Sequence, residues 1–168
     1  EYTIWFDLDR SFEEVDDYDW QSTTPPLPTS EAIEQMHDLL SRRDFLKQTI
    51  AKCAFDDWHG RFANGMWSDR LDEVQEDFEA ANVPLPTTPE ELESLITLCE
   101  FRVLQANSKA YIDKQMKTSQ TESSKPAYWV DFHVGKDGET ILEEEHGCGA
   151  CFDKEYNCID LSHSFEAC

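Results

Sequence analysis

The sequence is poor in basic residues: 14 Lys and Arg face 36 Asp and Glu, which gives a formal net charge of −22. Nucleic acids and anionic lipid surfaces both attract clustered Lys and Arg, so this composition excludes a nucleic-acid partner and argues against an anionic membrane. Opposite charges steer association instead. We therefore expect a protein partner or a basic extracellular partner.

Long hydrophobic runs are also missing. A membrane-spanning helix needs about 20 mostly apolar residues, and no segment of this chain comes close to that length, so we expect no membrane insertion. The first residue is Glu1 rather than Met. We interpret the chain as a mature form whose targeting segment has been removed, which together with the cysteine content predicts a secreted, extracellular protein.

Recognisable catalytic motifs are absent, including a serine nucleophile elbow, a glycine-rich phosphate loop and an H-E-x-x-H zinc motif. One weak candidate for general acid–base chemistry remains, because Asp131, His133 and Glu143 cluster around a predicted hairpin. Charged side chains on the exposed side of a hairpin are also an ordinary outcome. We predict no cofactor and no metal, and whether the protein is an enzyme stays open, with a non-enzyme favoured.

Six cysteines are present, and four of them crowd the last 21 residues. An even number in a secreted chain favours structural disulfides. The pair Cys148 and Cys151 forms a C-x-x-C motif, for which a zinc site and a redox pair are the alternatives. We expect Cys53 to pair with Cys99 across two helices and the last four cysteines to pair among themselves. The disulfide candidates are Cys53, Cys99, Cys148, Cys151, Cys158 and Cys168.

The chain of 168 residues fits one domain, and its sequence patterns divide it into five segments. Alternating apolar residues predict an N-terminal strand, followed by an acidic stretch. Apolar residues at steps of three and four predict helices over about 30–54, from Ser68 onward, and from Thr88 to about 117. Alternation returns after Pro126 and predicts a hairpin. The segments are 1–20, the Pro-rich connector 21–29, the helical region 30–117, the mobile linker 118–126, and the hairpin with its Cys-rich tail 127–168.

These elements predict an α+β fold. Three main helices would pack on a small antiparallel sheet made of the N-terminal strand and the C-terminal hairpin, with a disulfide-stabilised tail closing one side. The segment between the first two helices is rich in aromatic side chains, which dominate binding hot spots but also fill cores. The sequence leaves both interpretations open for the candidate binding residues Trp58, His59, Arg61, Phe62 and Trp67.

In composition and cysteine placement the chain is similar to small secreted cysteine-containing proteins of fungi and related microbes, many of which act as effectors or toxins. This similarity and the strong acidity predict a secreted, disulfide-stabilised interaction protein of effector, toxin or inhibitor type, which binds a protein or a cell-surface partner. A small secreted hydrolase using the Asp, His and Glu of the hairpin is one alternative. An acidic cation-binding or immunity-type protein that neutralises a basic target is another.

Overall fold

The structure is a computed structural model. It describes residues 3–6, 28–60, 66–67, 70–104, 125–142 and 147–163. The predicted acidic stretch, most of the Pro-rich connector and most of the 118–126 linker lie outside these residues. Four helices and a mixed six-stranded sheet make up the described part, so the α+β class is confirmed. No described helix has the length and hydropathy needed to cross a bilayer.

Two helices stand where the sequence predicted one over 30–54. Helix α1 spans Ser30–Ser41 and α2 spans Arg43–Trp58, with a break at Arg42. The predicted start is confirmed, because the Thr29 hydroxyl accepts a hydrogen bond from the Ala32 amide at 3.1 Å. At the break, the Arg42 guanidinium binds Asp38 and lies 4.6 Å from the centre of the Tyr156 ring. Both contacts lie at the break between the two helices. The periodicity of the sequence alone does not reveal this break.

Helix α3 spans Leu71–Ala80 and buries Val74 and Phe78, as its predicted apolar stripe requires. Just beyond its C-cap, Ala81, lies Asn82, whose φ of 53° is a left-handed conformation that asparagine tolerates well. The Val83 amide donates to the Phe78 carbonyl at 3.0 Å, which closes a Schellman motif. This motif turns the chain sharply away from the helix and towards the sheet.

The predicted long helix from Thr88 to about 117 is wrong. Helix α4 covers only Pro89–Leu95, and strand β2, Ile96–Val103, follows directly. The start was correctly predicted: Thr88 caps the Glu91 amide at 3.2 Å, and the Glu91 carboxylate accepts from the Thr87 amide at 2.7 Å. The apolar residues of β2 fit a helical stripe, but pairing with two neighbouring strands decides the conformation.

The strands of the sheet follow the order β1-β2-β3-β5-β6. The edge strand β1, Thr3–Phe6, runs parallel to β2, and the other pairings are antiparallel, so the sheet is mixed and larger than predicted. The predicted hairpin is present as β3, Tyr128–Lys136, and β4, Glu139–Leu142. Strands β4 and β5, Cys148–Phe152, follow one another along the same edge of β3.

The predicted cysteine-rich tail is part of the same sheet: β5 and β6, Cys158–His163, form a second hairpin. Its turn is held by Asp153, whose carboxylate accepts from the Glu155 and Asn157 amides at 2.9 and 2.8 Å. The described part of the tail is therefore ordered by backbone pairing, whereas the sequence had suggested a disulfide-stabilised tail.

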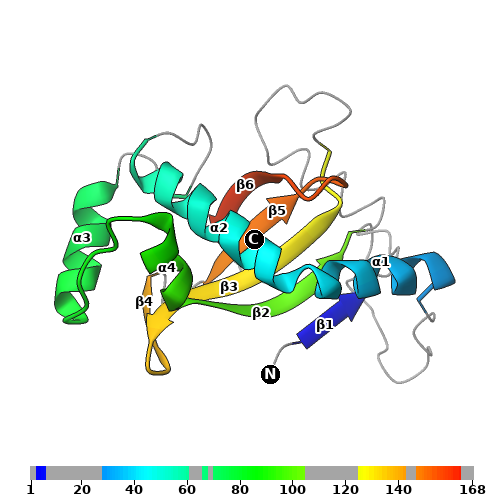
Figure 1. Cartoon of the computed structure of the whole chain (residues 1–168), viewed down its shortest axis with the longest axis horizontal. Coiled ribbons are helices and arrows are strands. Elements are labelled where there is room, and N and C mark those ends of the chain that lie inside the picture. Colours follow the sequence, from blue (N-terminus) through cyan, green and yellow to red (C-terminus); the bar gives the residue numbers. More distant parts are fainter. Residues whose placement is uncertain are drawn as a thin grey trace, which may run out of the picture.

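Helices α1 and α2 run across one face of the sheet, and the hydrophobic core lies between the two layers (Figure 1). Alternate residues of β3 point into this core, namely Tyr128, Val130, Phe132 and Val134. The intervening residues Trp129 and Asp131 are also buried, although they point to the opposite face. We call that side of the sheet the second face. Helices α3 and α4 and strand β4 gather at one end of the molecule (Figure 1).

Candidate functional site

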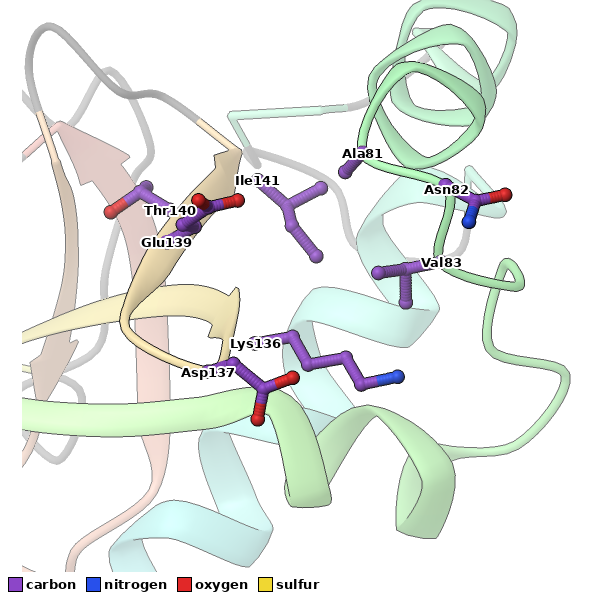
Figure 2. A pocket seen from close by; sticks show the side chains of 8 residues that line it. All are labelled: Ala81, Asn82, Val83, Lys136, Asp137, Glu139, Thr140 and Ile141. Carbon is purple, nitrogen blue, oxygen red and sulfur yellow. The ribbon is translucent and has the colours of Figure 1, made fainter.

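A hollow of about 400 Å³ lies between the end of α3 and the β3–β4 hairpin. Figure 2 shows Val83 and Ile141 reaching towards each other across it, while the Lys136 side chain extends along one side. The Asn82 side chain points away from the hollow in the same view. The hollow therefore has an apolar wall and charged side chains at its rim. Its lining is Ala81, Asn82, Val83, Lys136, Asp137, Glu139, Thr140 and Ile141.

The tight turn of the hairpin fixes the position of these rim residues. Asp137 and Gly138 both have positive φ, 54° and 90°, as a two-residue hairpin turn of the primed type requires. A Cβ at Gly135 would lie 2.2 Å from the Glu139 carbonyl oxygen, so only glycine allows the two strands to approach here. The hairpin lies between α3, which packs against β4, and α4, which packs against β3.

A second hollow of about 400 Å³ lies on the other side of the same turn, against the end of α4. Ser94, Leu95 and Thr97 line it from α4 and β2, and His133 lines it from β3. Both hollows share Lys136, Asp137, Glu139 and Thr140. A ligand that spans the turn would therefore contact both.

The elements around these hollows carry a high density of carboxylates. Residues 70–95 and 136–139 contain ten acidic residues and two basic ones, Arg70 and Lys136. Arg70 is engaged by Glu73 in an ion pair of 2.6 Å. We call this region the acidic end of the molecule; its carboxylates belong to Asp72, Glu73, Glu76, Asp77, Glu79, Glu90, Glu91, Glu93, Asp137 and Glu139.

The second face of the sheet holds a buried polar cluster. The Trp129 indole donates to the Asp131 carboxylate at 2.7 Å, and the Arg102 guanidinium lies 4.0 Å from the same carboxylate. Glu100 also pairs with Arg102, at 3.1 Å. Buried charges persist only where they are paired, so this cluster is a structural element of the sheet. The sequence did not predict it, because residues 100–102 were expected on a helix.

Of the three weak catalytic candidates, the structure describes Asp131 and His133, and these two do not form an acid–base pair. Asp131 is 6% exposed and is engaged by Trp129 and Arg102, whereas His133 is exposed, two residues further along β3. Glu143 lies outside the described residues. The structure brings Asp131 and His133 onto one side of the sheet but leaves them in different surroundings. Over the described ranges, no three His, Cys, Asp or Glu side chains are grouped as metal ligands.

Two aromatic residues of the predicted binding segment, Trp58 and Trp67, belong to the hydrophobic core. Trp58 and Trp67 are 1% and 2% exposed, and their ring centres lie 6.3 Å apart. The buried Asp57 carboxylate accepts from the Trp67 amide at 2.7 Å, which ties the segment back to α2. Trp58 and Trp67 are therefore core residues, which is one of the two interpretations that the sequence left open. Of the other candidates, His59 is exposed, while Arg61 and Phe62 lie outside the described residues.

The cysteines are distributed differently from the expected pairing. Cys148 and Cys151 are three residues apart on β5, so they point to opposite faces and cannot join each other. Cys99 lies at a bulge of β2, where burial and the Asp131 carboxylate raise the pKa of its thiol to about 11. The thiols of Cys53 and Cys99 are both free in the structure, and the Cys158 thiol of β6 donates to the Asp160 carbonyl at 3.6 Å. Cys168 lies outside the described residues.

No known family matches this chain. Comparison with curated proteins and with solved structures found no match either. The functional argument therefore depends on the residues of this chain and their geometry, and above all on the acidic end with its two hollows.

Sequence reasoning identified the hairpin turn but missed its role as the shared wall of two hollows. The sequence did contain part of the information on the acidic end, since the two short segments that form α3 and α4 carry most of its carboxylates. What the sequence could not supply was the spatial relationship: α3 packs against β4, and α4 packs against β3. That packing brings two separate acidic segments to one end of the sheet.

Proposed function

We propose that this protein is a secreted interaction protein and that it binds a basic protein partner through its acidic end. The observation that carries the proposal is that Asp137 and Glu139 line both hollows beside the β3–β4 turn, while the helices on either side, α3 and α4, carry eight further carboxylates. Electrostatic attraction of this kind accelerates association and selects partners by charge. The protein would act by occupying such a partner, as an effector, toxin or inhibitor does.

The hollow beside α3 suits a lysine or arginine side chain of that partner. Such a side chain has an apolar stem and a cationic head. The stem would lie against Val83 and Ile141, and the head would reach the carboxylates of Asp137 or Glu139. Lys136 also lines the hollow, and its positive charge restricts where a second cation can be placed.

Two matched variants test whether the acidic end is the binding surface. The first replaces Asp72, Glu76, Glu90 and Glu139 by their amides, and the second makes the same change at Glu31, Glu34, Asp44 and Glu155, which lie on other elements. All eight side chains are exposed, so both variants should fold. Each variant loses four negative charges, so any effect of net charge alone is equal in the two.

Binding to lysozyme, used as a basic probe protein, is measured by interferometry across a salt series. We expect the acidic-end variant to bind about tenfold more weakly at low salt, which corresponds to about 1.4 kcal/mol. The matched variant should change far less, and added salt should reduce the difference, because exposed charges are screened over about 8 Å at physiological ionic strength. Equal weakening of both variants would contradict a localised site.

A further inference from the structure

The positive and the negative charges of the hollow beside α3 are held apart. In Figure 2 the Lys136 side chain runs towards the loop that follows α3, and its amine ends on the side of Val83. The carboxylates of Asp137 and Glu139 stay beside the hairpin in the same view. The apolar wall of Val83 and Ile141 is common to both sides. The hollow therefore offers a cation, an apolar surface and two carboxylates to one ligand.

These three charged side chains are available to such a ligand. All of them are exposed, and among the described residues no ion pair engages Lys136, Asp137 or Glu139. The other basic side chain of the acidic end, Arg70, is already bound by Glu73 at 2.6 Å. Within the acidic end, Lys136 is therefore the basic group that can receive an anion from outside.

We propose that this hollow binds the C-terminal residue of the basic partner, a lysine or arginine whose α-carboxylate is free. The inference rests on the proposed function and names the part of the partner that the site selects. The side-chain cation would pair with Asp137 or Glu139, and the α-carboxylate with Lys136. The aliphatic stem would lie along Val83 and Ile141.

Lys136 is the reason why a terminal residue suits the hollow better than an internal one. An internal lysine brings only a cation, which the Lys136 amine repels. A C-terminal lysine carries a carboxylate at the other end of its aliphatic stem, and the same amine attracts that carboxylate. Specificity arises from contacts that penalise the wrong partner as well as from contacts that favour the right one. Lys136 supplies both kinds of contact.

Ligands with other charge patterns fit this hollow less well. An anion without a cation would meet the carboxylates of Asp137 and Glu139. Free lysine has a second ammonium group beside its carboxylate, and that group would face the Lys136 amine. The peptide bond at the end of a polypeptide carries no such charge. The hollow beside α4 shares the three charged residues, but Val83 and Ile141 line only the hollow beside α3.

Two peptides that differ in one group test the role of the terminal carboxylate. Both are acetylated chains of glycine and serine that end in lysine, one as the free acid and one as the amide. Each is titrated at low salt into the isotope-labelled whole chain, and NMR shifts of the Asn82 and Ile141 amides report the location and the Kd. The amide is the more positive peptide, so the net charge of −22 alone would make it bind more tightly. We expect the opposite, with the free acid bound about threefold to fivefold more tightly, as one exposed ion pair allows.

Two matched variants assign the preference to one side chain. Lys136→Gln should reverse it, because this change removes the partner of the carboxylate and the repulsion of the cation. Lys52→Gln makes the same change of charge on α2, lines neither hollow, and should keep the preference.

The outcomes separate this inference from the proposed function. Shifts at the same amides with equal binding of the two peptides, or with tighter binding of the amide, would overturn the terminal carboxylate and leave the cation site of the proposed function intact. The same holds if Lys136→Gln keeps the preference of the original protein. No shifts with either peptide would overturn both the inference and that cation site. Tighter binding of free lysine than of the free-acid peptide would overturn a polypeptide end as the ligand.

Discussion

The Trp129 indole lies directly over Gly149 of the neighbouring strand, and a Cβ at position 149 would come within 2.3 Å of its ring. Both residues are buried on the second face of the sheet. We predict that Gly149→Ala lowers the free energy of unfolding by about 1–3 kcal/mol, because overpacking forces the indole or the strand to move. Urea denaturation measures the change.

The control for this prediction is the same substitution in a Trp129→Phe background. The smaller ring leaves room for a methyl group, so the cost of Gly149→Ala should fall there by about 1 kcal/mol or more. An undiminished cost in that background would show that the penalty comes from the backbone at position 149 and not from the contact with the indole.

Because Asp131 belongs to the buried polar cluster and His133 is exposed, we expect substitutions at these two β3 residues to differ in their effect on stability. Asp131→Asn keeps an acceptor for the Trp129 indole but removes the negative charge beside Arg102, so we expect a loss of about 1–3 kcal/mol in unfolding free energy. His133→Ala removes an exposed side chain and should change stability by about 0.5 kcal/mol or less. Thermal and urea denaturation of both variants provide the comparison, and a larger loss for His133→Ala would contradict this account.

The Tyr156 hydroxyl donates to the Asp38 carboxylate at 2.5 Å and stacks its ring on that of Tyr128 at 4.9 Å. These contacts fasten α1 to the turn between β5 and β6. We predict that Tyr156→Phe lowers stability by about 1 kcal/mol at neutral pH, since a hydrogen bond to a half-exposed carboxylate is lost. Tyr128→Phe is the control, because its hydroxyl lies 3.4 Å from that of Tyr156 and contributes little.

The cost of Tyr156→Phe should also depend on pH. The hydrogen bond from Tyr156 holds the pKa of Asp38 below its ordinary value, so the associated stability is present above pH 4 and is lost as pH falls through the lowered pKa. Urea denaturation at pH 7 and at pH 3 should therefore give a smaller difference between the two proteins at the acidic value. An equal difference at both values would assign the cost to packing.

Sequence reasoning identified the elements whose signals are local. The cap at Thr88, the α3 stripe and the β3–β4 hairpin all follow from neighbouring residues. It failed over residues 96–103, where an apolar spacing compatible with a helix is used as a strand. The deciding factor is pairing with β1 and β3, which are distant in sequence.

The candidate site depended even more on distant contacts. The carboxylates of α3 and α4 are visible in the sequence, but the packing of α3 against β4 and of α4 against β3, which brings both helices to one end of the sheet, is a property of the folded structure. Likewise, spacing alone could not determine which cysteines lie near one another, since six cysteines allow fifteen pairings. For the aromatic residues the sequence identified the candidates but not their environment. Periodicity did not reveal that Trp58 and Trp67 are buried.

Asp160 on β6 provides a pH-dependent prediction with a defined sign. Burial disfavours its charged form and raises its pKa to about 7, with a contribution from the nearby Asp57 carboxylate. In the unfolded chain an aspartate titrates near pH 4. The folded protein therefore keeps a proton that the unfolded chain has released, so the associated stability is fully present below about pH 4 and is lost as pH rises to about 7.

Asp160→Asn places a permanently neutral side chain at this position. Relative to the original protein, we expect little change in unfolding free energy near pH 4 and a gain of about 1–2 kcal/mol at pH 8, a value reduced by solvent screening at this partly exposed side chain. Urea denaturation at both pH values measures the change, with the exposed Asp44→Asn as control. Other titrating groups cancel in each comparison, so a constant difference between pH 4 and pH 8 would mean that folding does not raise the pKa of Asp160.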